Sequence, residues 1–282
     1  WNDDWDSSAL VVDGYLLEGG ENSQWHAVEL RRSYGPDGRV VVDPRLAFHA
    51  PGWDDELLRD LGDRDVSIEG SLALFEGVAY FANSGGLVQG WDVSGLAEGR
   101  PPTRVFWFWT GDDTDATVVV DDQGMLYVAS QWERRSVRAQ QVGQVMKLDP
   151  ARSDPLVWSV ADQGDSKAGV WATPALHRDL VIVPTHGGRL LGLDKETGAV
   201  RWERRLPAPT WQSPTVVDDV LIMGDCHGVL HGYDVSDTTV GPPELWSVRL
   251  GGCIESTPAV WGGRIYLGTR GGFFYALGDR KN

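Results

Sequence analysis

Tryptophan recurs at a fixed interval in the second half of the chain. Trp158, Trp202 and Trp246 stand 44 residues apart in one frame. Between them the same unit returns: a small-residue and Pro step, an apolar run, a turn, a second apolar run, a Gly-rich turn and a third run that ends in Asp. A fixed interval of this size is typical of repeat architectures. The chain is therefore expected to fold as copies of one supersecondary unit.

Six copies of this unit can be aligned. The fourth and fifth are the clearest, and Pro174 and Pro214 fix their register. The expected bounds of the six copies are 5–50, 68–110, 114–161, 171–206, 211–250 and an incomplete 255–279. A chain of 282 residues could form one large all-β domain or two smaller ones, and the repeat favours a single domain, 1–282.

Each copy is expected to contain four short antiparallel strands. The apolar runs are rich in β-branched residues and are bounded by turn residues, such as Asp13-Gly14 and Glu76-Gly77 in the first turn and Gly85-Gly86 in the second. The fourth strand carries an aromatic residue in five copies: Phe48, Trp107, Trp158, Trp202 and Trp246. Four antiparallel strands in about 40–50 residues predict a propeller blade, so the fold class is an all-β propeller. The four tryptophans are expected to dock one blade onto the next.

Two insertions interrupt the repeat. Residues 51–66 predict a short helix, because Leu57, Leu58 and Leu61 have helical spacing and Asp54 and Asp55 fall in its first turn. Residues 130–142 lengthen the second turn of the third copy. Such an insertion is either a plain surface loop or a loop that binds a partner.

Charge and hydropathy exclude some classes of function. The net charge of −16 is the opposite of the basic face that nucleic acids require. The sequence has no run of 18 apolar residues that would span a membrane. It begins at Trp1 without Met, as a mature form or a fragment would.

The last copies resemble a known family of propeller repeats. "TPAVWGGRIYLGTRGGFFYAL" in copy six and "GLDKETGAVRW" in copy four are similar to the tryptophan-docked repeats of pyrroloquinoline-quinone (PQQ) type propellers. That superfamily contains quinoprotein alcohol dehydrogenases, a BamB-like branch without catalysis, and sensor domains of bacterial kinases. The resemblance implies seven or eight blades and a place outside the cytoplasm, periplasmic or secreted. Copy six stops before its fourth strand, so we expect part of a larger propeller, completed by blades before Trp1 or by a neighbouring chain.

The resemblance does not carry catalytic residues to this chain. The PQQ enzymes hold the quinone beneath a bridge between adjacent cysteines, whereas Cys226 and Cys253 lie 27 positions apart. Neither a G-x-S-x-G nor an H-E-x-x-H motif occurs. We therefore expect no catalytic residue and no PQQ, and the chain is placed with the non-catalytic, BamB-like branch.

Acidic residues gather at the start of the first strand in copies one to three. The aligned positions there are Asp6, Glu69 and Asp115, against Ala172, Gln212 and Ser256 in copies four to six. The preceding loops add Asp3, Asp4, Asp112 and Asp113. This set predicts a site for Ca²⁺, for another cation or for a basic partner segment. The alternative is that each Asp caps a turn through local hydrogen bonds.

The Gly-rich turns place further polar residues on the same face. Ser84, His186, Cys226 and Arg270 align there and are candidates to contact a ligand. Neighbouring blades bring Cys226 near Cys253, which leaves two alternatives, a disulfide or two buried thiols.

Three functions follow from these observations. The leading hypothesis is a non-catalytic binding or scaffold propeller outside the cytoplasm, which holds a protein or a small ligand on one face. The first alternative is a PQQ- and Ca-dependent quinoprotein oxidoreductase acting on alcohols or sugars. The second alternative is the ligand-sensing module of a larger receptor.

Overall fold

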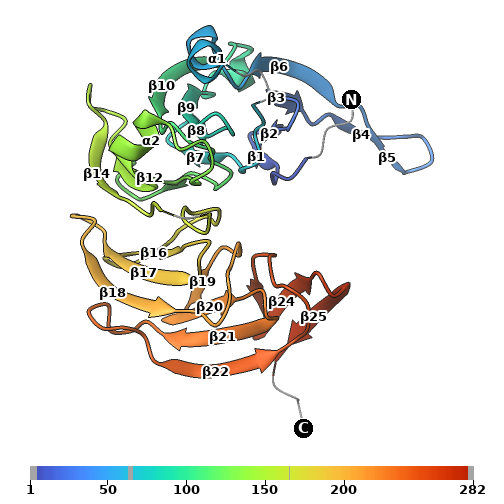
Figure 1. Cartoon of the computed structure of the whole chain (residues 1–282). Coiled ribbons are helices and arrows are strands. Elements are labelled where there is room, and N and C mark those ends of the chain that lie inside the picture. The colour runs from blue at the N-terminus through green and yellow to red at the C-terminus, as the bar shows by residue number, and fades with distance from the viewer. Residues whose placement is uncertain (1–4, 63–65, 165, 279–282) are drawn as a thin grey trace. The chain divides into compact units, whose positions relative to one another are not determined.

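The structure is a computed structural model that describes residues 5–62, 66–164 and 166–278 (Figure 1). Strands dominate it. The helices among these residues are short: α1 (Asp55–Leu61), α2 (Val137–Val142) and the 3₁₀ turn η1 (Leu96–Glu98). Within the described part of the chain, no helix has the length and apolar character needed to cross a membrane.

The strands form a series of small antiparallel sheets. Five sheets have four strands and one has three, and in each sheet the strands that follow one another in the chain pair side by side. The strands of the first three sheets are β1 (Leu10–Val12), β2 (Tyr15–Gly19), β3 (Gln24–Glu29) and β6 (Arg45–Pro51); β7 (Ala73–Phe75), β8 (Val78–Phe81), β9 (Leu87–Asp92) and β10 (Thr103–Trp109); and β11 (Val119–Val120), β12 (Leu126–Ala129), β13 (Val145–Leu148) and β14 (Leu156–Val160).

The remaining sheets repeat the same order. Their strands are β15 (Ala175–His177), β16 (Leu180–Pro184), β17 (Arg189–Asp194) and β18 (Val200–Arg205); β19 (Thr215–Val217), β20 (Val220–Gly224), β21 (Val229–Asp234) and β22 (Glu244–Arg249); and β23 (Ala259–Trp261), β24 (Arg264–Thr269) and β25 (Phe273–Leu277). Each of these six sheets corresponds to one of the six sequence copies. We call each of the six sheets a blade and number the blades in chain order.

The chain divides into two compact units. The first contains Trp1–Leu126, Arg134–Gln141 and Asp149–Pro155, and the second contains the rest. The third sheet contributes strands to both units. The first unit includes blades one and two, and the second includes blades four to six.

The tight turns use the residues that their backbone geometry demands. In the first turn of blade one, Asp13 and Gly14 have φ of 48° and 82°, and in blade two Glu76 and Gly77 have φ of 46° and 81°. Two successive positive φ values match the twist of a hairpin, and Gly adopts the second at no steric cost. These turns fix the register of the strands they join.

In blades four and five, a tryptophan on the fourth strand lies over a glycine on the third strand. Trp202 pairs with Gly192, and Trp246 pairs with Gly232. A Cβ atom on either glycine would overlap the indole. Trp202 is buried in a cluster that includes Leu221 of the next blade, and Trp246 packs against a cluster that includes Ile254. The glycine therefore makes room for an indole that contacts the following blade.

Blade two corrects one expectation. Trp107 is 60% exposed, so it does not dock. Phe106 takes that place, because it pairs with Gly90 and is only 6% exposed. In blade three, Trp158 lies in the expected position and donates from Nε1 to the Lys195 carbonyl at 3.1 Å.

The first insertion contains α1. The Asp54 side chain accepts from the Leu57 N–H at 2.9 Å, and Gly62 ends the helix in the left-handed region. Leu57 is buried in a cluster with Val66 and Leu87. The helix is thereby packed against the start of β9.

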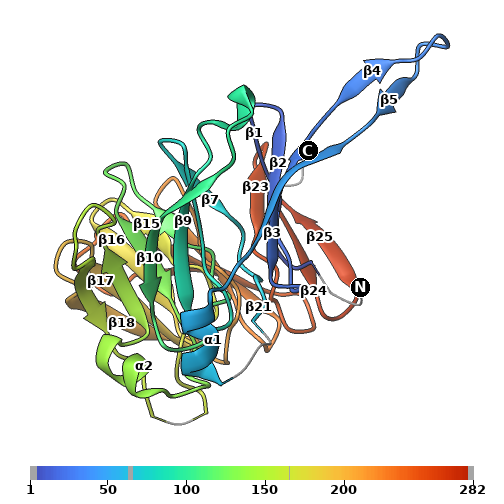
Figure 2. The same ribbon diagram turned by 90° about the horizontal axis from the view of Figure 1, so that it is seen from above.

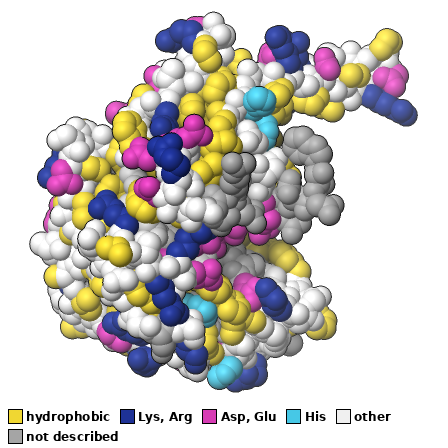
Figure 3. All heavy atoms as spheres, turned by 45° about the horizontal axis from the view of Figure 1, so that its top comes forward, with side chains coloured by type: hydrophobic (Ala, Val, Ile, Leu, Met, Phe, Trp, Pro, Cys, Tyr) yellow, Lys and Arg dark blue, Asp and Glu magenta, His cyan; other side chains and the backbone are white. Residues whose placement is uncertain are grey.

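Two further elements are not anticipated by the repeat. The segment 130–142 contains α2 rather than an irregular loop. A two-stranded hairpin, β4 (Arg32–Tyr34) and β5 (Val40–Val42), is inserted before β6 and projects from the first sheet (Figure 2). All six of its strand residues are exposed, and hydrophobic and charged side chains cover this arm at the upper right of Figure 3.

Candidate functional site

Three acidic side chains meet in the first unit. Asp6 precedes β1, Glu21 lies in the turn between β2 and β3, and Glu69 precedes β7. One carboxylate oxygen from each lies within 4.8 Å of the others. Asp6 is exposed and the two glutamates are half-buried. This spacing lets a single cation contact all three side chains.

Asp113 and Asp115 extend this group, which we call the acidic cluster (Asp6, Glu21, Glu69, Asp113 and Asp115). Burial raises the pKa of Asp115 to about 10, and the charges of Asp113 and Glu69 add to the shift. Asp115 therefore keeps its proton at neutral pH and hydrogen-bonds its two acidic neighbours. A bound cation would favour the ionised form that these neighbours oppose.

Asp112 has a different role from its neighbours. It is fully buried, and its carboxylate accepts from the backbone N–H groups of Arg134 and Arg135 at 2.9 Å each. It therefore holds the start of the 134–141 segment instead of pointing at a ligand. Asp3 and Asp4, which the sequence placed in the same site, lie outside the described residues.

The polar residues of the Gly-rich turns have local partners. Ser84 is buried, and its Oγ accepts from the Ser67 N–H at 2.8 Å. Arg270 pairs with Glu255 at 2.6 Å. His186 packs against Trp171, with ring centroids 4.2 Å apart, and Trp171 in turn stacks on Trp211 at 5.4 Å. These groups are occupied in local packing.

Cys226 and Cys253 are joined in a disulfide. The bond links the second turn of blade five to the segment before the first strand of blade six. The described residues contain no free cysteine. Of the two alternatives that the sequence left open, the structure has the disulfide.

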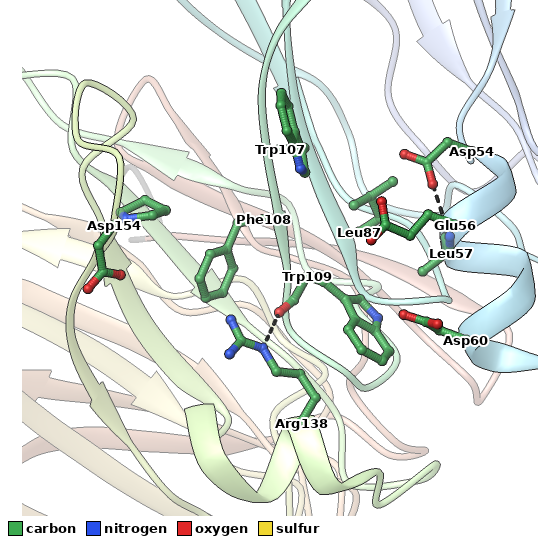
Figure 4. Close-up of a pocket in the computed structure, with 11 residues that line it drawn as sticks. Asp54, Glu56, Leu57, Asp60, Leu87, Trp107, Phe108, Trp109, Arg138 and Asp154 are labelled. Atoms are coloured by element: carbon green, nitrogen blue, oxygen red, sulfur yellow. Dashed lines mark hydrogen bonds between the residues drawn. The ribbon is translucent and has the colours of Figure 1, made fainter.

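A pocket of about 270 Å³ lies at β10 in the first unit, and sequence reasoning did not identify it (Figure 4). Three consecutive residues of β10 line it. The other walls come from α1 and the residue before it, from the start of β9, from α2 and from the segment between β13 and β14. The lining residues are Asp54, Glu56, Leu57, Asp60, Leu87, Trp107, Phe108, Trp109, Arg138, Asp154 and Pro155.

Arginine side chains already lie against the aromatic rings of this pocket. The Arg104 guanidinium is 5.4 Å from the centre of the Trp107 ring and pairs with Asp54 at 2.8 Å. The Arg138 guanidinium lies 5.1 Å over Phe108, and its Nε donates to the Trp109 carbonyl at 3.0 Å. Although burial opposes ionisation of Asp54, the Leu57 N–H and Arg104 lower its pKa below the ordinary value.

The sequence does carry one signal for the pocket. "RVFWFW", residues 104–109, places an aromatic side chain at every position from 106 to 109. A strand with one buried face needs aromatic residues only at alternate positions. The extra tryptophans therefore mark an exposed aromatic face.

Comparisons with known proteins agree with this fold. A family model described as outer membrane protein assembly factor BamB matches residues 141–277. The solved structure of BamB from Moraxella catarrhalis has a TM-score of 0.56 and 22% identity, covering 73% of this chain and 56% of that chain. A chain of a mitotic checkpoint complex has a TM-score of 0.63 and 12% identity, covering 94% of this chain and 72% of that chain. No curated protein matches the sequence.

The fold and the repeat define a β-propeller of four-stranded antiparallel blades with PQQ-type repeats. Within that class, residues 141–277 are similar to the family model described as outer membrane protein assembly factor BamB. This chain spans 56% of the length of the BamB structure it matches.

Proposed function

We propose that this chain is a non-catalytic binding propeller that works outside the cytoplasm and holds a protein partner on a surface of its first unit. The surface consists of the acidic cluster and the segment 134–141. The polar side chains of the Gly-rich turns are engaged in local packing. The fold itself does not specify an activity, so we infer that this surface binds a partner.

The observation that carries the proposal is the anchoring of the 134–141 segment. Asp112 holds its backbone, Ser136 Oγ donates to the Gly111 carbonyl at 2.6 Å, and Arg138 donates to Trp109. A loop fixed in this way loses little conformational entropy when a partner binds. Val137 on the same segment is 70% exposed.

Two features support a place outside the cytoplasm. Disulfides persist in oxidising compartments and are rare in the cytosol, and this chain contains one between Cys226 and Cys253. The matching family model is described as an outer membrane assembly factor. Secretion or export is therefore proposed for this chain.

The quinoprotein alternative is not favoured. Its enzymes use adjacent cysteines, whereas the two cysteines of this chain are 27 residues apart and bonded to each other. A dye-linked alcohol or sugar oxidation that requires PQQ and Ca²⁺, and that Asp115→Asn abolishes, would reverse this preference. A sensor module would instead be recognised by a receptor domain in the same protein.

Photo-crosslinking in the native host tests the proposed function. A photoreactive residue in place of Val137 is expected to capture one defined protein. The same residue in place of Val240, which is 51% exposed on blade five, is the matched control and should not. Equal capture at both positions, or none at Val137, would contradict a partner on this surface.

As a second candidate role, we propose that the acidic cluster binds a divalent cation. The observation that favours it is the approach of three carboxylates within 4.8 Å beside Asp115, whose burial opposes ionisation. Hard cations such as Ca²⁺ prefer several carboxylate oxygens.

Calorimetric titration with Ca²⁺ tests this role. Calcium at about 100 times its Kd should raise the unfolding free energy by about 2.7 kcal/mol. Glu69→Gln should remove the heat and the stabilisation, while Asp122→Asn, in a turn outside the cluster, should keep both. No heat and an unchanged Tm with the unmodified protein would show that these carboxylates serve other purposes.

A further inference from the structure

The outer edge of β10 is open for pairing. β10 is the last strand of its sheet, in the order β10-β9-β8-β7. The Thr110 N–H donates inward to Gly86, so in an antiparallel ladder the backbone groups of Trp107 and Trp109 point outward. Arg138 occupies the Trp109 carbonyl. Among the described residues, nothing bonds the outward N–H and C=O of Trp107.

The pocket follows this edge around both faces of the strand. Consecutive strand residues point to opposite faces, and Trp107, Phe108 and Trp109 all line the pocket. Figure 4 shows Phe108 directed toward Arg138 and Trp109 directed toward Asp60. A peptide chain that pairs with this edge would also point its side chains alternately to the two faces. Every second side chain would therefore contact pocket residues on the same face of β10.

The exposed aromatic ring is suited to a cation. Trp107 is 60% exposed although it carries the largest apolar side chain. Its ring already attracts the guanidinium of Arg104 from within the chain. A second Lys or Arg can approach the remaining exposed ring surface in the same way.

The charged side chains that line the pocket also favour a cationic ligand. Glu56 and Asp60 on α1, and Asp154 opposite them, are exposed and have no ion-pair partner in the described part of the chain. Arg138 is the one basic side chain that lines the pocket, and its guanidinium is engaged by Phe108 and Trp109. The free charges of the lining are therefore negative.

We propose that the edge of β10 binds an extended segment of a protein partner that carries Lys or Arg at alternate positions. The segment adds a strand to blade two, with main-chain hydrogen bonds at Trp107. Its basic side chains all point to one face of that strand, where they contact the Trp107 ring and the carboxylates of Glu56 and Asp60. This inference rests on the proposed function, since it names the surface and the kind of segment that a protein partner would use.

Calorimetry with a synthetic peptide tests the proposal. The probe is an eight-residue peptide of alternating Arg and Thr, and its counterpart replaces Arg with Glu. The Arg peptide is expected to bind and the Glu peptide not. Trp107→Ala should weaken binding of the Arg peptide about tenfold, and the pair Glu56→Gln and Asp60→Asn should weaken it and reduce its dependence on salt.

Two controls separate edge pairing from general attraction to an acidic protein. Leu245→Ala changes a residue that is 52% exposed on β22, the outer strand of blade five, and should leave binding unchanged. An Arg peptide with N-methylated backbone amides should bind at least tenfold more weakly, because it cannot pair with a strand. Both Trp107 and Leu245 are exposed, so neither variant is expected to unfold.

The outcomes distinguish this inference from the proposed function. Equal binding of the Arg and Glu peptides, or equal effects of Trp107→Ala and Leu245→Ala, would overturn the basic-segment proposal. Self-association that Trp107→Ala removes would show that a second copy is the occupant instead. A Val137 crosslink that persists unchanged in Trp107→Ala would overturn the role of this edge and leave the proposed function standing.

Discussion

Phe106 and Trp107 are adjacent in the sequence and have opposite roles, because successive strand residues point to opposite faces. Phe106 is buried opposite Gly90, whereas Trp107 is exposed at the pocket. The sequence alone does not show which of the two residues is buried against the next blade. A one-residue irregularity precedes the docking aromatic, the loops before the fourth strand vary in length, and residues 106–109 are all aromatic. Alignment on tryptophan therefore chose the wrong neighbour.

The two tryptophan positions predict different costs of truncation. Trp202→Ala should lower the unfolding free energy by about 3–5 kcal/mol, because it removes a buried indole and leaves a cavity. Trp107→Ala should change it by less than about 0.5 kcal/mol, because that side chain is exposed. Urea unfolding of both variants measures the difference. Similar costs would mean that Trp107 is a docking residue after all.

The raised pKa of Asp115 makes a prediction about pH. The pKa of Asp115 in the folded protein is about 10, whereas the pKa of an Asp in the unfolded chain is about 4. The folded protein keeps a proton that the unfolded chain has released between these values. The contribution of Asp115 to stability is therefore fully present below about pH 4 and is lost as pH rises toward about 10.

Asp115→Asn replaces the protonated carboxyl with a neutral group of similar shape. Its Tm is expected to exceed that of the unmodified protein by a margin that grows between about pH 5 and about pH 8. Thermal unfolding followed by circular dichroism at several pH values measures this margin. A difference that does not change with pH would contradict a proton held by Asp115.

At the scale of the element, the docking tryptophans of blades four and five each lie over a glycine, Gly192 and Gly232. Gly232→Ala should destabilise the protein by about 1–3 kcal/mol, because the added Cβ would overlap Trp246. Gly241→Ala in the same blade is the control, since nothing lies within 4 Å of a Cβ there. Denaturant unfolding compares the two variants. An equal effect would remove the packing explanation.

Elements set by local chemistry were predictable from the sequence. The helix α1 lies within the segment 51–66 because leucine spacing and an Asp cap act over one turn. The hairpin β4–β5 and the helix α2 were missed because they are additions to the repeat. The pocket was missed because its walls come from five separate segments of the chain.

At the scale of the whole molecule, the repeat predicts the blades but not their partners. The interval between tryptophans depends on packing that recurs in every copy, so one sequence reveals it. The acidic cluster was predicted in part, because Asp6, Glu69 and Asp115 share one repeat position; Glu21 was not, since it lies in a turn of variable sequence. The sequence analysis placed Asp112 in the same cluster. Its hydrogen bonds to the inserted segment 134–141 could not be predicted, because the fold of that segment does not follow from the repeat.

The disulfide predicts a dependence of stability on redox conditions. Cys226 and Cys253 stand 27 positions apart, and their disulfide ties blade five to blade six. Its reduction should lower the unfolding free energy by about 2–4 kcal/mol. A reductant should therefore lower the Tm of the unmodified protein and not that of a variant with both cysteines replaced by Ser. A reductant effect on the Ser variant would point to another cause.

Hydrogen exchange on the complex tests the central claim, that a protein partner binds the first unit, most directly. The chain would be compared free and bound to the protein captured at Val137. The account predicts slower amide exchange in β10 and in residues 134–141, with β22 unchanged. Protection confined to blades four to six, or no protection in the first unit, would contradict it.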